Sequence, residues 1–132
     1  KDKRITDVDR AYHRMAVLAT AIGFDVHEAD IDGRSRRDKV AHARMTAYWL
    51  MRTAIGTPYE IIGILFNRDH TGVMYGCKRI GDMIELGLTT YSNNWAKEIK
   101  ESRKRFAKFH KSRVEVDVER KLKEVANVIE ST

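Results

Sequence analysis

Two helix-start signals, separated by one short apolar segment, constrain the fold of this chain more than any other feature of its sequence. Residues 57–60 read TPYE, in which a threonine stands at the capping position, a proline at the first helical position and a glutamate two residues later. After the apolar segment, Asn67 and Arg68 form a tight turn and Asp69 caps the next helix. This order of elements predicts a helix-turn-helix over about residues 57–86.

The whole chain favours helices, because it holds one proline and eight glycines and few runs of β-branched residues. Apolar side chains at helical spacing predict a first helix over about residues 7–22, with Gly23 as its C-cap, and a second helix over about residues 37–54. A short irregular or one-turn helical link joins them through residues 24–33. The expected fold is therefore all-α, a helical bundle that contains the helix-turn-helix.

The character of the chain changes after Gly87, where we place the boundary of the globular domain. Residues 1–87 form that domain, and residues 88–132 form a linker followed by a basic amphipathic helical tail. The linker is expected at 88–94. Within the tail, three alternating valines in residues 114–118 indicate a brief extended segment before the helical period returns.

Two interpretations of the tail stay open at the level of sequence. An apolar stripe exposed to water is unfavourable, which favours packing of the tail on the domain or on a partner, including a second copy in an oligomer. The basic residues of the tail also suit a second DNA contact, or a contact with RNA polymerase or another regulator. The stripe consists of Trp95, Ile99, Phe106 and Phe109.

Residues 68–80, RDHTGVMYGCKRI, have the pattern of a DNA recognition helix. Val73, Cys77 and Ile80 share one face and provide an apolar seam that holds the helix against its neighbours. In a recognition helix, polar and basic side chains near the N-terminus reach base edges and phosphates. The net charge of +6 and the isoelectric point near 9.5 agree with a polyanion as partner. The side chains left for the outer faces are His70, Thr71, Tyr75, Lys78 and Arg79.

The same run resembles the signature of domain IV, the C-terminal DNA-binding domain of the bacterial replication initiator DnaA, which reads close to RDHTTVxHAxxKI. Residues 24–31 resemble the stretch that precedes the basic loop of that family. Residues 33–45, GRSRRDKVAHARM, resemble the basic loop and the helix after it. The resemblance covers roughly residues 10–86 and implies a DnaA/Trp-repressor-like helix-turn-helix.

What the resemblance implies about individual residues can be carried over only where the motif matches. Asp69, His70 and Thr71 are identical to the family and imply contacts with bases and phosphates in the major groove. Arg36 stands at the place of an arginine that the family inserts into the minor groove. Arg44 matches an arginine at the DNA backbone.

The chain also departs from the family pattern. Gly72 replaces the second threonine of the motif, and Tyr75 replaces a second base-reading histidine. His42 and Ala43 replace an arginine and a proline. These differences imply that the docking mode is shared but that the DNA sequence read is different.

The expected DNA-binding residues lie in the basic loop and the helix after it, at the start of the helix-turn-helix, and in its turn and second helix. They are Arg34, Arg36, Arg37, Arg44, Pro58, Tyr59, Arg68, Asp69, His70, Thr71, Gly72, Tyr75, Lys78 and Arg79.

The function expected from these features is sequence-specific binding of double-stranded DNA through both grooves. The sequence has no G-x-x-x-x-G-K-[ST] loop and no room for an ATPase domain, which favours a phage or mobile-element transcription regulator. The alternatives are an origin-binding replication factor, or a protein-interaction scaffold whose basic surface is incidental.

Other functional classes have little support in the sequence. The five histidines are far apart and a single cysteine cannot complete a zinc site, so we expect no metal and no cofactor. No nucleophile, phosphate loop or paired base indicates an enzyme. No stretch is long and apolar enough to predict a membrane span or a signal peptide. The lone Cys77 suits a reducing cytoplasm, and we expect the protein at the nucleoid.

Overall fold

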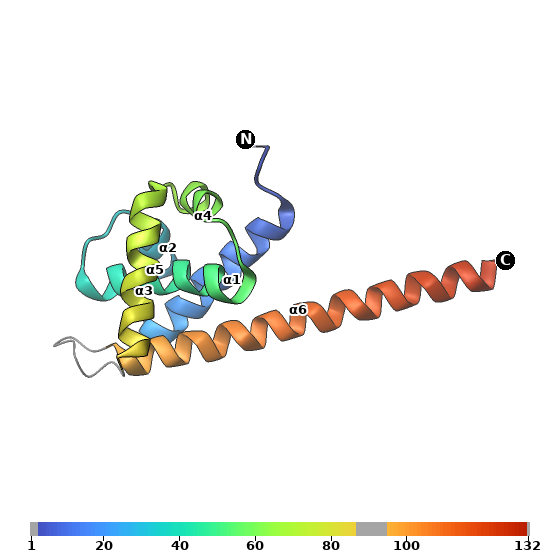
Figure 1. Cartoon of the computed structure of the whole chain (residues 1–132). Helices are drawn as coiled ribbons and strands as arrows, with labels where there is room; N and C mark the ends of the chain where they lie inside the picture. Colours follow the sequence, from blue (N-terminus) through green and yellow to red (C-terminus); the bar gives the residue numbers. More distant parts are fainter. Residues whose placement is uncertain (1–2, 87–94, 132) are drawn as a thin grey trace.

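The computed structural model describes residues 3–86 and 95–131, and these residues contain helices and no strand. Figure 1 shows a compact group of helices and one long helix that runs past it. The prediction of an all-α fold is confirmed. In chain order the elements are α1 (Asp7–Phe24), α2 (Glu28–Asp32), α3 (Asp38–Leu50), the π-helical turn η1 (Met51–Ile55), α4 (Tyr59–Phe66), α5 (His70–Glu85) and α6 (Ala96–Ser131).

Helix α1 begins at a capping box and ends two residues later than the sequence indicated. The Thr6 hydroxyl accepts a hydrogen bond from the Asp9 backbone amide, and the Asp9 carboxylate accepts one from the Thr6 amide, each at 3.0 Å. The C-cap is Asp25, in the left-handed conformation with φ 55°, so the assignment of Gly23 as the cap is wrong. A β-carbon at Gly23 would lie 2.1 Å from the Ser102 hydroxyl oxygen, because α6 crosses α1 at this point.

The second predicted helix changes character before its end. It is α-helical through Leu50, widens into η1, and stops at Gly56, whose φ of 80° suits a glycine. The Thr57 amide donates to the Met51 carbonyl oxygen at 3.1 Å, so Thr57 completes the end of this helix. It is buried and does not cap α4. The N-cap of α4 is Pro58, without a side-chain hydrogen bond, so the predicted capping box at 57–60 is wrong.

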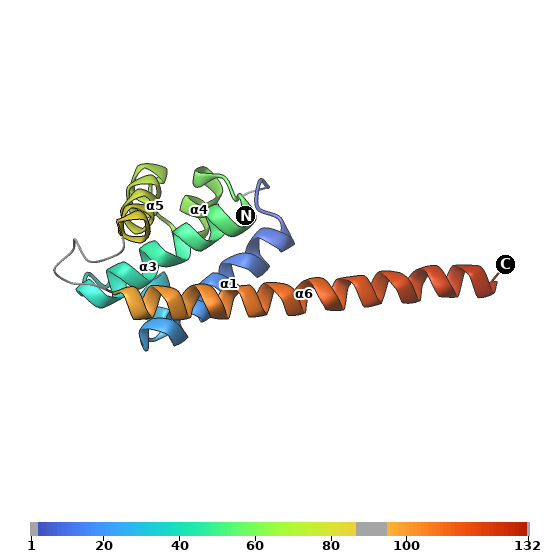
Figure 2. The same ribbon diagram turned by 60° about the horizontal axis from the view of Figure 1, so that its bottom comes forward.

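The hydrophobic core joins α1, α3 and α5 with the first half of α6. Ile99 and Phe106 of α6 are fully buried in the same cluster as Phe24 of α1, and Trp95 and Phe109 pack at its edge. Figure 2 shows α6 lying along α1 and α3. Packing of the aromatic stripe on the domain is therefore confirmed, and the core extends beyond the boundary expected at Gly87. The linker expected at 88–94 lies outside the described residues.

Helix α6 is continuous over 36 residues, which corrects the expectation of an extended segment at 114–118. Three alternating valines are too short a signal to outweigh the helical period on both sides of them. The second half of α6 projects away from the group formed by α1 to α5 (Figure 1).

Replacement of Gly23 by alanine tests the close contact between α1 and α6. The new methyl group meets the Ser102 hydroxyl and, at 2.8 Å, the Ser102 backbone nitrogen, so α6 has to shift. We expect the free energy of unfolding to fall by about 1–3 kcal/mol, despite the higher helix propensity of alanine. Urea denaturation measures the change.

Gly72→Ala is the matched control, because a β-carbon at this helical glycine meets no atom within 4 Å. Here we expect a gain of about 0.5–1 kcal/mol from helix propensity alone. Equal effects of the two substitutions would contradict a tight helix crossing at Gly23.

Candidate nucleic-acid interface

The turn between α4 and α5 has the tight geometry of a helix-turn-helix. Asn67 takes the left-handed conformation with φ 54°, and the Arg68 amide donates to the Gly63 carbonyl oxygen at 2.7 Å. A β-carbon at Gly63 would lie 2.6 Å from the Arg68 carbonyl oxygen. The chain therefore needs a glycine at this position to bring the start of α5 against α4.

Asp69 caps α5, as the sequence predicts. Its carboxylate accepts a hydrogen bond from the Thr71 backbone amide at 3.2 Å, and the same oxygen lies 3.2 Å from the His70 Nδ1 atom. The seam of α5 is buried at Val73, Cys77 and Ile80. Burial raises the pKa of the Cys77 thiol to about 11, so this side chain serves as a small apolar group.

The outward face of α5 presents the side chains that a recognition helix needs. His70, Thr71 and Lys78 are exposed, and the Tyr75 side chain is 64% exposed. Met74, 46% exposed, lies beside them and was missed by the sequence reasoning. Its position three residues after Thr71 is the signal that places it on the same face.

The two cations at the middle of α5 differ in their surroundings. Lys78 is exposed and forms an ion pair with Asp82, one turn later, at 3.0 Å. The Arg79 Nε atom is 3.4 Å from the Nε2 atom of His42 on α3, and Arg79 is half-buried. Lys78 is therefore better placed than Arg79 to reach a phosphate group.

Arg44 holds the basic loop before α3 in place. It is only 8% exposed, and its guanidinium donates to the carbonyl oxygens of Ile31 at 2.8 Å, Asp30 at 2.8 Å and Gly33 at 3.1 Å. Burial, and next the charge of Arg68, lower the pKa of Arg44 from its ordinary value. The hydrogen bonds of Arg44 are thus directed into the protein, and its expected contact with the DNA backbone stays a prediction.

Arg68 reaches the same loop from the helix-turn-helix. Its guanidinium donates to the Gly33 carbonyl oxygen and also to the carbonyl oxygens of Phe66 at 3.2 Å and Asn67 at 3.3 Å. Arg68 is half-buried and braces the loop, and its expected role as a DNA contact stays a prediction. One carbonyl group, that of Gly33, therefore ties the basic loop to α3 and to the turn before α5.

The other arginines of the loop are on the surface. Arg34 and Arg36 are exposed, and Arg37 is exposed with its guanidinium 3.4 Å from the Asp30 carboxylate. These three side chains emerge from a segment whose backbone is fixed by Arg44 and Arg68. Their guanidinium groups can reach outward from the loop. Arg37 is the most restricted of the three, because it contacts the Asp30 carboxylate.

The start of α4 lies near the outer face of α5. Pro58 is exposed, and the ring of Tyr59 is half-buried beneath the guanidinium of Arg52, which lies 4.2 Å from the ring centroid. Arg52 and Tyr59 line one concave surface together with Thr71, Tyr75 and Lys78. The sequence reasoning included Tyr59 and missed Arg52.

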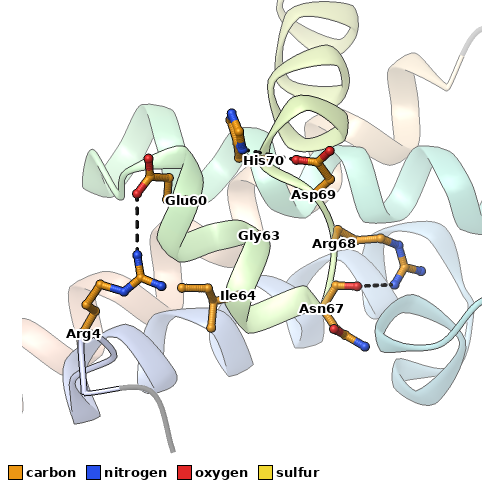
Figure 3. Close-up of a pocket in the computed structure, with 8 residues that line it drawn as sticks. All are labelled: Arg4, Glu60, Gly63, Ile64, Asn67, Arg68, Asp69 and His70. Atoms are coloured by element: carbon orange, nitrogen blue, oxygen red, sulfur yellow. Dashed lines mark hydrogen bonds and ion pairs between the residues drawn. The ribbon is translucent and has the colours of Figure 1, made fainter.

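A shallow pocket opens at the helix-turn-helix itself. Figure 3 shows Arg4, from the segment before α1, pointing to Glu60 of α4, with the two charged groups 3.7 Å apart. Asp69 and His70 line the opposite side of this pocket. Arg4 thus places a cation beside the N-terminus of α5, a placement that no sequence signal indicated.

The described residues contain no group of three or more metal-ligating side chains. Among the helices at 3–86 and 95–131, none combines the length and the apolar character needed to cross a membrane.

Residues 17–80 match the sequence model of a family described as the bacterial dnaA protein helix-turn-helix. The chromosomal replication initiator protein DnaA of Tropheryma whipplei (strain Twist) is 32% identical over 74 residues, which cover 56% of this chain and 16% of the relative. The protein of the same name from Clavibacter sepedonicus is 37% identical over 93 residues, covering 70% and 18%. That of Picosynechococcus is 38% identical over 71 residues, covering 53% and 15%. The chain thus spans less than a fifth of the length of these relatives.

Exchange of Arg44 for methionine tests its bracing role. The variant removes the arginine donor from the Asp30 and Ile31 carbonyl groups of α2 and one of the two arginine donors from the Gly33 carbonyl group of the loop. We therefore expect the free energy of unfolding to fall by about 2–3 kcal/mol. Arg36→Met is the matched control, since Arg36 is exposed, and its unfolding free energy should change by less than about 0.5 kcal/mol. Thermal unfolding followed by circular dichroism compares the two. Equal stability of both variants would mean that the buried guanidinium does not support the loop.

Proposed function

Because the chain belongs, over residues 17–80, to the bacterial dnaA protein helix-turn-helix family, we propose that it binds double-stranded DNA at preferred sequences, with α5 in the major groove and the loop before α3 in the minor groove. The observation that carries this proposal is the attachment of the basic loop to the helix-turn-helix through the Gly33 carbonyl group. That attachment fixes the exposed face of α5 and the exposed arginines of the loop relative to each other.

The major-groove part of the proposal rests on the outward face of α5. His70 and Thr71 lie in its first turn, where a recognition helix approaches the base edges most closely. A hydroxyl and an imidazole can both donate to and accept from base edges, and the exposed Met74 and Tyr75 suit the methyl group of thymine. We assign base reading to this face.

The minor-groove part rests on Arg34 and Arg36. Both are exposed, and neither is needed to hold the loop, because Arg44 and Arg68 do that. A narrow minor groove has an enhanced negative potential that attracts an inserted arginine. We assign this insertion to Arg36, at the position where the family pattern places its minor-groove arginine.

Phosphate contacts supply the affinity that does not depend on sequence. Lys78 on α5 and the exposed N-terminal end of α4 at Pro58 flank the base-reading face. A helix N-terminus and a lysine side chain are both suitable donors to phosphate oxygens. The net charge of +6 supports steering of the protein to DNA.

The names of the relatives support a proposal about one aspect of the biological role, the kind of DNA site that is bound. Because they are named chromosomal replication initiators, we propose that the DNA sites recognised are of the kind found at replication origins. The role of a phage or mobile-element transcription regulator, the contact with RNA polymerase and the location at the nucleoid stay predictions. Mapping the bound DNA across the host genome distinguishes a role in replication from a role in transcription. One cluster of sites at an origin indicates replication, and scattered promoter sites indicate transcription.

Removal of the base-reading side chains should weaken specific binding selectively. For His70→Ala and for Thr71→Ala we expect a loss of about 1–3 kcal/mol on the preferred site and little change on random DNA. Lys78→Ala is the matched control on the same helix, and it should weaken binding to both DNAs about equally. Fluorescence anisotropy with the two duplexes measures the difference. Unchanged specific binding by His70→Ala would rule out its contact with a base.

The Arg36 assignment predicts a dependence on the sequence that flanks the major-groove site. Arg36→Ala should lower affinity most on duplexes with A·T-rich flanks, where the minor groove is narrow, and less on G·C-rich flanks. Competition binding with the two duplexes at one fixed salt concentration provides the measurement. An equal loss on both would reduce Arg36 to an ordinary phosphate contact.

A further inference from the structure

The two halves of α6 differ in what they contact. Residues 96–110 lie against the domain and bury Ile99, Ser102 and Phe106. Arg113 still reaches the domain, with its guanidinium 5.5 Å from the ring centroid of Tyr12. From there to Ser131 the helix runs away from α1 to α5, as both ribbon views show. Residues 111–131, here called the distal segment, have a length of about 31 Å at 1.5 Å per residue.

The distal segment carries an apolar stripe that is open to solvent. Successive apolar residues of the stripe are four, four, three and four positions apart in the sequence. The last three of these intervals match the alternating a and d positions of a coiled coil. Such an exposed row is unusual on a protein surface that has no partner. The members of the stripe and their exposed fractions are Val114 (45%), Val118 (50%), Leu122 (64%), Val125 (56%) and Ile129 (68%).

This stripe is not a continuation of the surface that packs on the domain. At 100° per residue, its centre at Val118 lies about 120° around the helix from Phe106. A straight α6 seated on α1 through Ile99 and Phe106 therefore directs the distal stripe to one side of the domain rather than onto it. The chain's own core does not cover it.

The charges of the distal segment differ from those of the rest of the chain. It holds five basic and five acidic residues, whereas residues 96–110 hold six basic and two acidic residues. A surface with no net charge does not suit the phosphates of DNA, and it lacks the basic polar face of a helix that lies on an anionic membrane. It also does not repel an identical surface, because both signs are interspersed.

We propose that the distal segment forms a two-stranded coiled coil with the same segment of a second copy of this chain. The stripe is then buried against itself, in layers formed by Val118, Leu122, Val125 and Ile129. The segment is three heptads long, the short end of what sustains a coiled coil, so the dimer is weak and dissociates at low concentration. Pairing also stabilises a helix that is rich in valine and would be marginal alone.

The dimer gives one particle two DNA-binding domains. Once one domain has bound, the second acts at a high effective concentration on a neighbouring site, so DNA with two sites is held more tightly than DNA with one. The pairing itself is independent of the proposed function, because the distal segment shares no residue with the DNA-binding surface.

The test is the mass of the full chain in solution without DNA. Sedimentation velocity from about 1 to 200 μM should show a shift from one to two copies, which persists in 1 M salt because the interface is apolar. The double substitution Val118→Glu and Leu122→Glu places charges in the centre of the stripe, and we expect a monomer at all these concentrations. Circular dichroism of the thermal transition checks that the domain stays folded.

The matched control is Val116→Glu. Val116 is 62% exposed on the same segment, but it lies on the side opposite the stripe, so this variant should still dimerise like the original chain. A monomeric original chain at 200 μM would overturn the proposal. A dimer that survives the double substitution would also overturn it, because the contact would then lie outside the stripe. Equal loss of the dimer in Val116→Glu would overturn it too, because the effect would not be specific to the stripe.

Discussion

The carbonyl group of Gly33 receives hydrogen bonds from two arginines that lie on different elements, Arg44 on α3 and Arg68 in the turn before α5. A backbone loop without regular structure has no ladder of its own to hold it, so external donors decide its conformation. Here the donors are buried or half-buried guanidinium groups, and hydrogen bonds from charged donors are about twice as strong as neutral ones. The relative placement of the basic loop and the recognition helix depends on this junction.

The arginines near that junction have two different roles. Arg44 and Arg68 direct their donors to backbone carbonyl groups inside the protein, whereas Arg34 and Arg36 extend from the loop that is held in this way. In the proposed complex, a side chain that supports the loop and one that enters a groove affect DNA binding by different routes. The first acts through the stability of the free protein and the second through contacts made only in the complex.

The two halves of helix α6 also have different roles. Its first half completes the core through Ile99 and Phe106 and crosses α1 where Gly23 allows backbone to approach backbone. Its second half leaves the domain with an apolar stripe turned to another side. One uninterrupted helix can thus stabilise the DNA-binding domain and, in the arrangement we propose, join it to a second copy without a flexible connection at the boundary.

The sequence by itself determined the all-α class, the helix-turn-helix with Asp69 as cap and the buried seam of α5, because these rest on local periodicity and capping chemistry. It misplaced the C-terminal end of α1 and the start of α4, where Gly23 and Thr57 serve contacts with distant or preceding elements rather than caps. The tertiary structure alone decided which arginines are braces, and it added Arg4, Arg52 and Met74 to the candidate surface. The physical reason is that every arginine carries the same charge and the same donors in the sequence, and only the position of its acceptors in space tells a buried brace from a side chain that faces DNA.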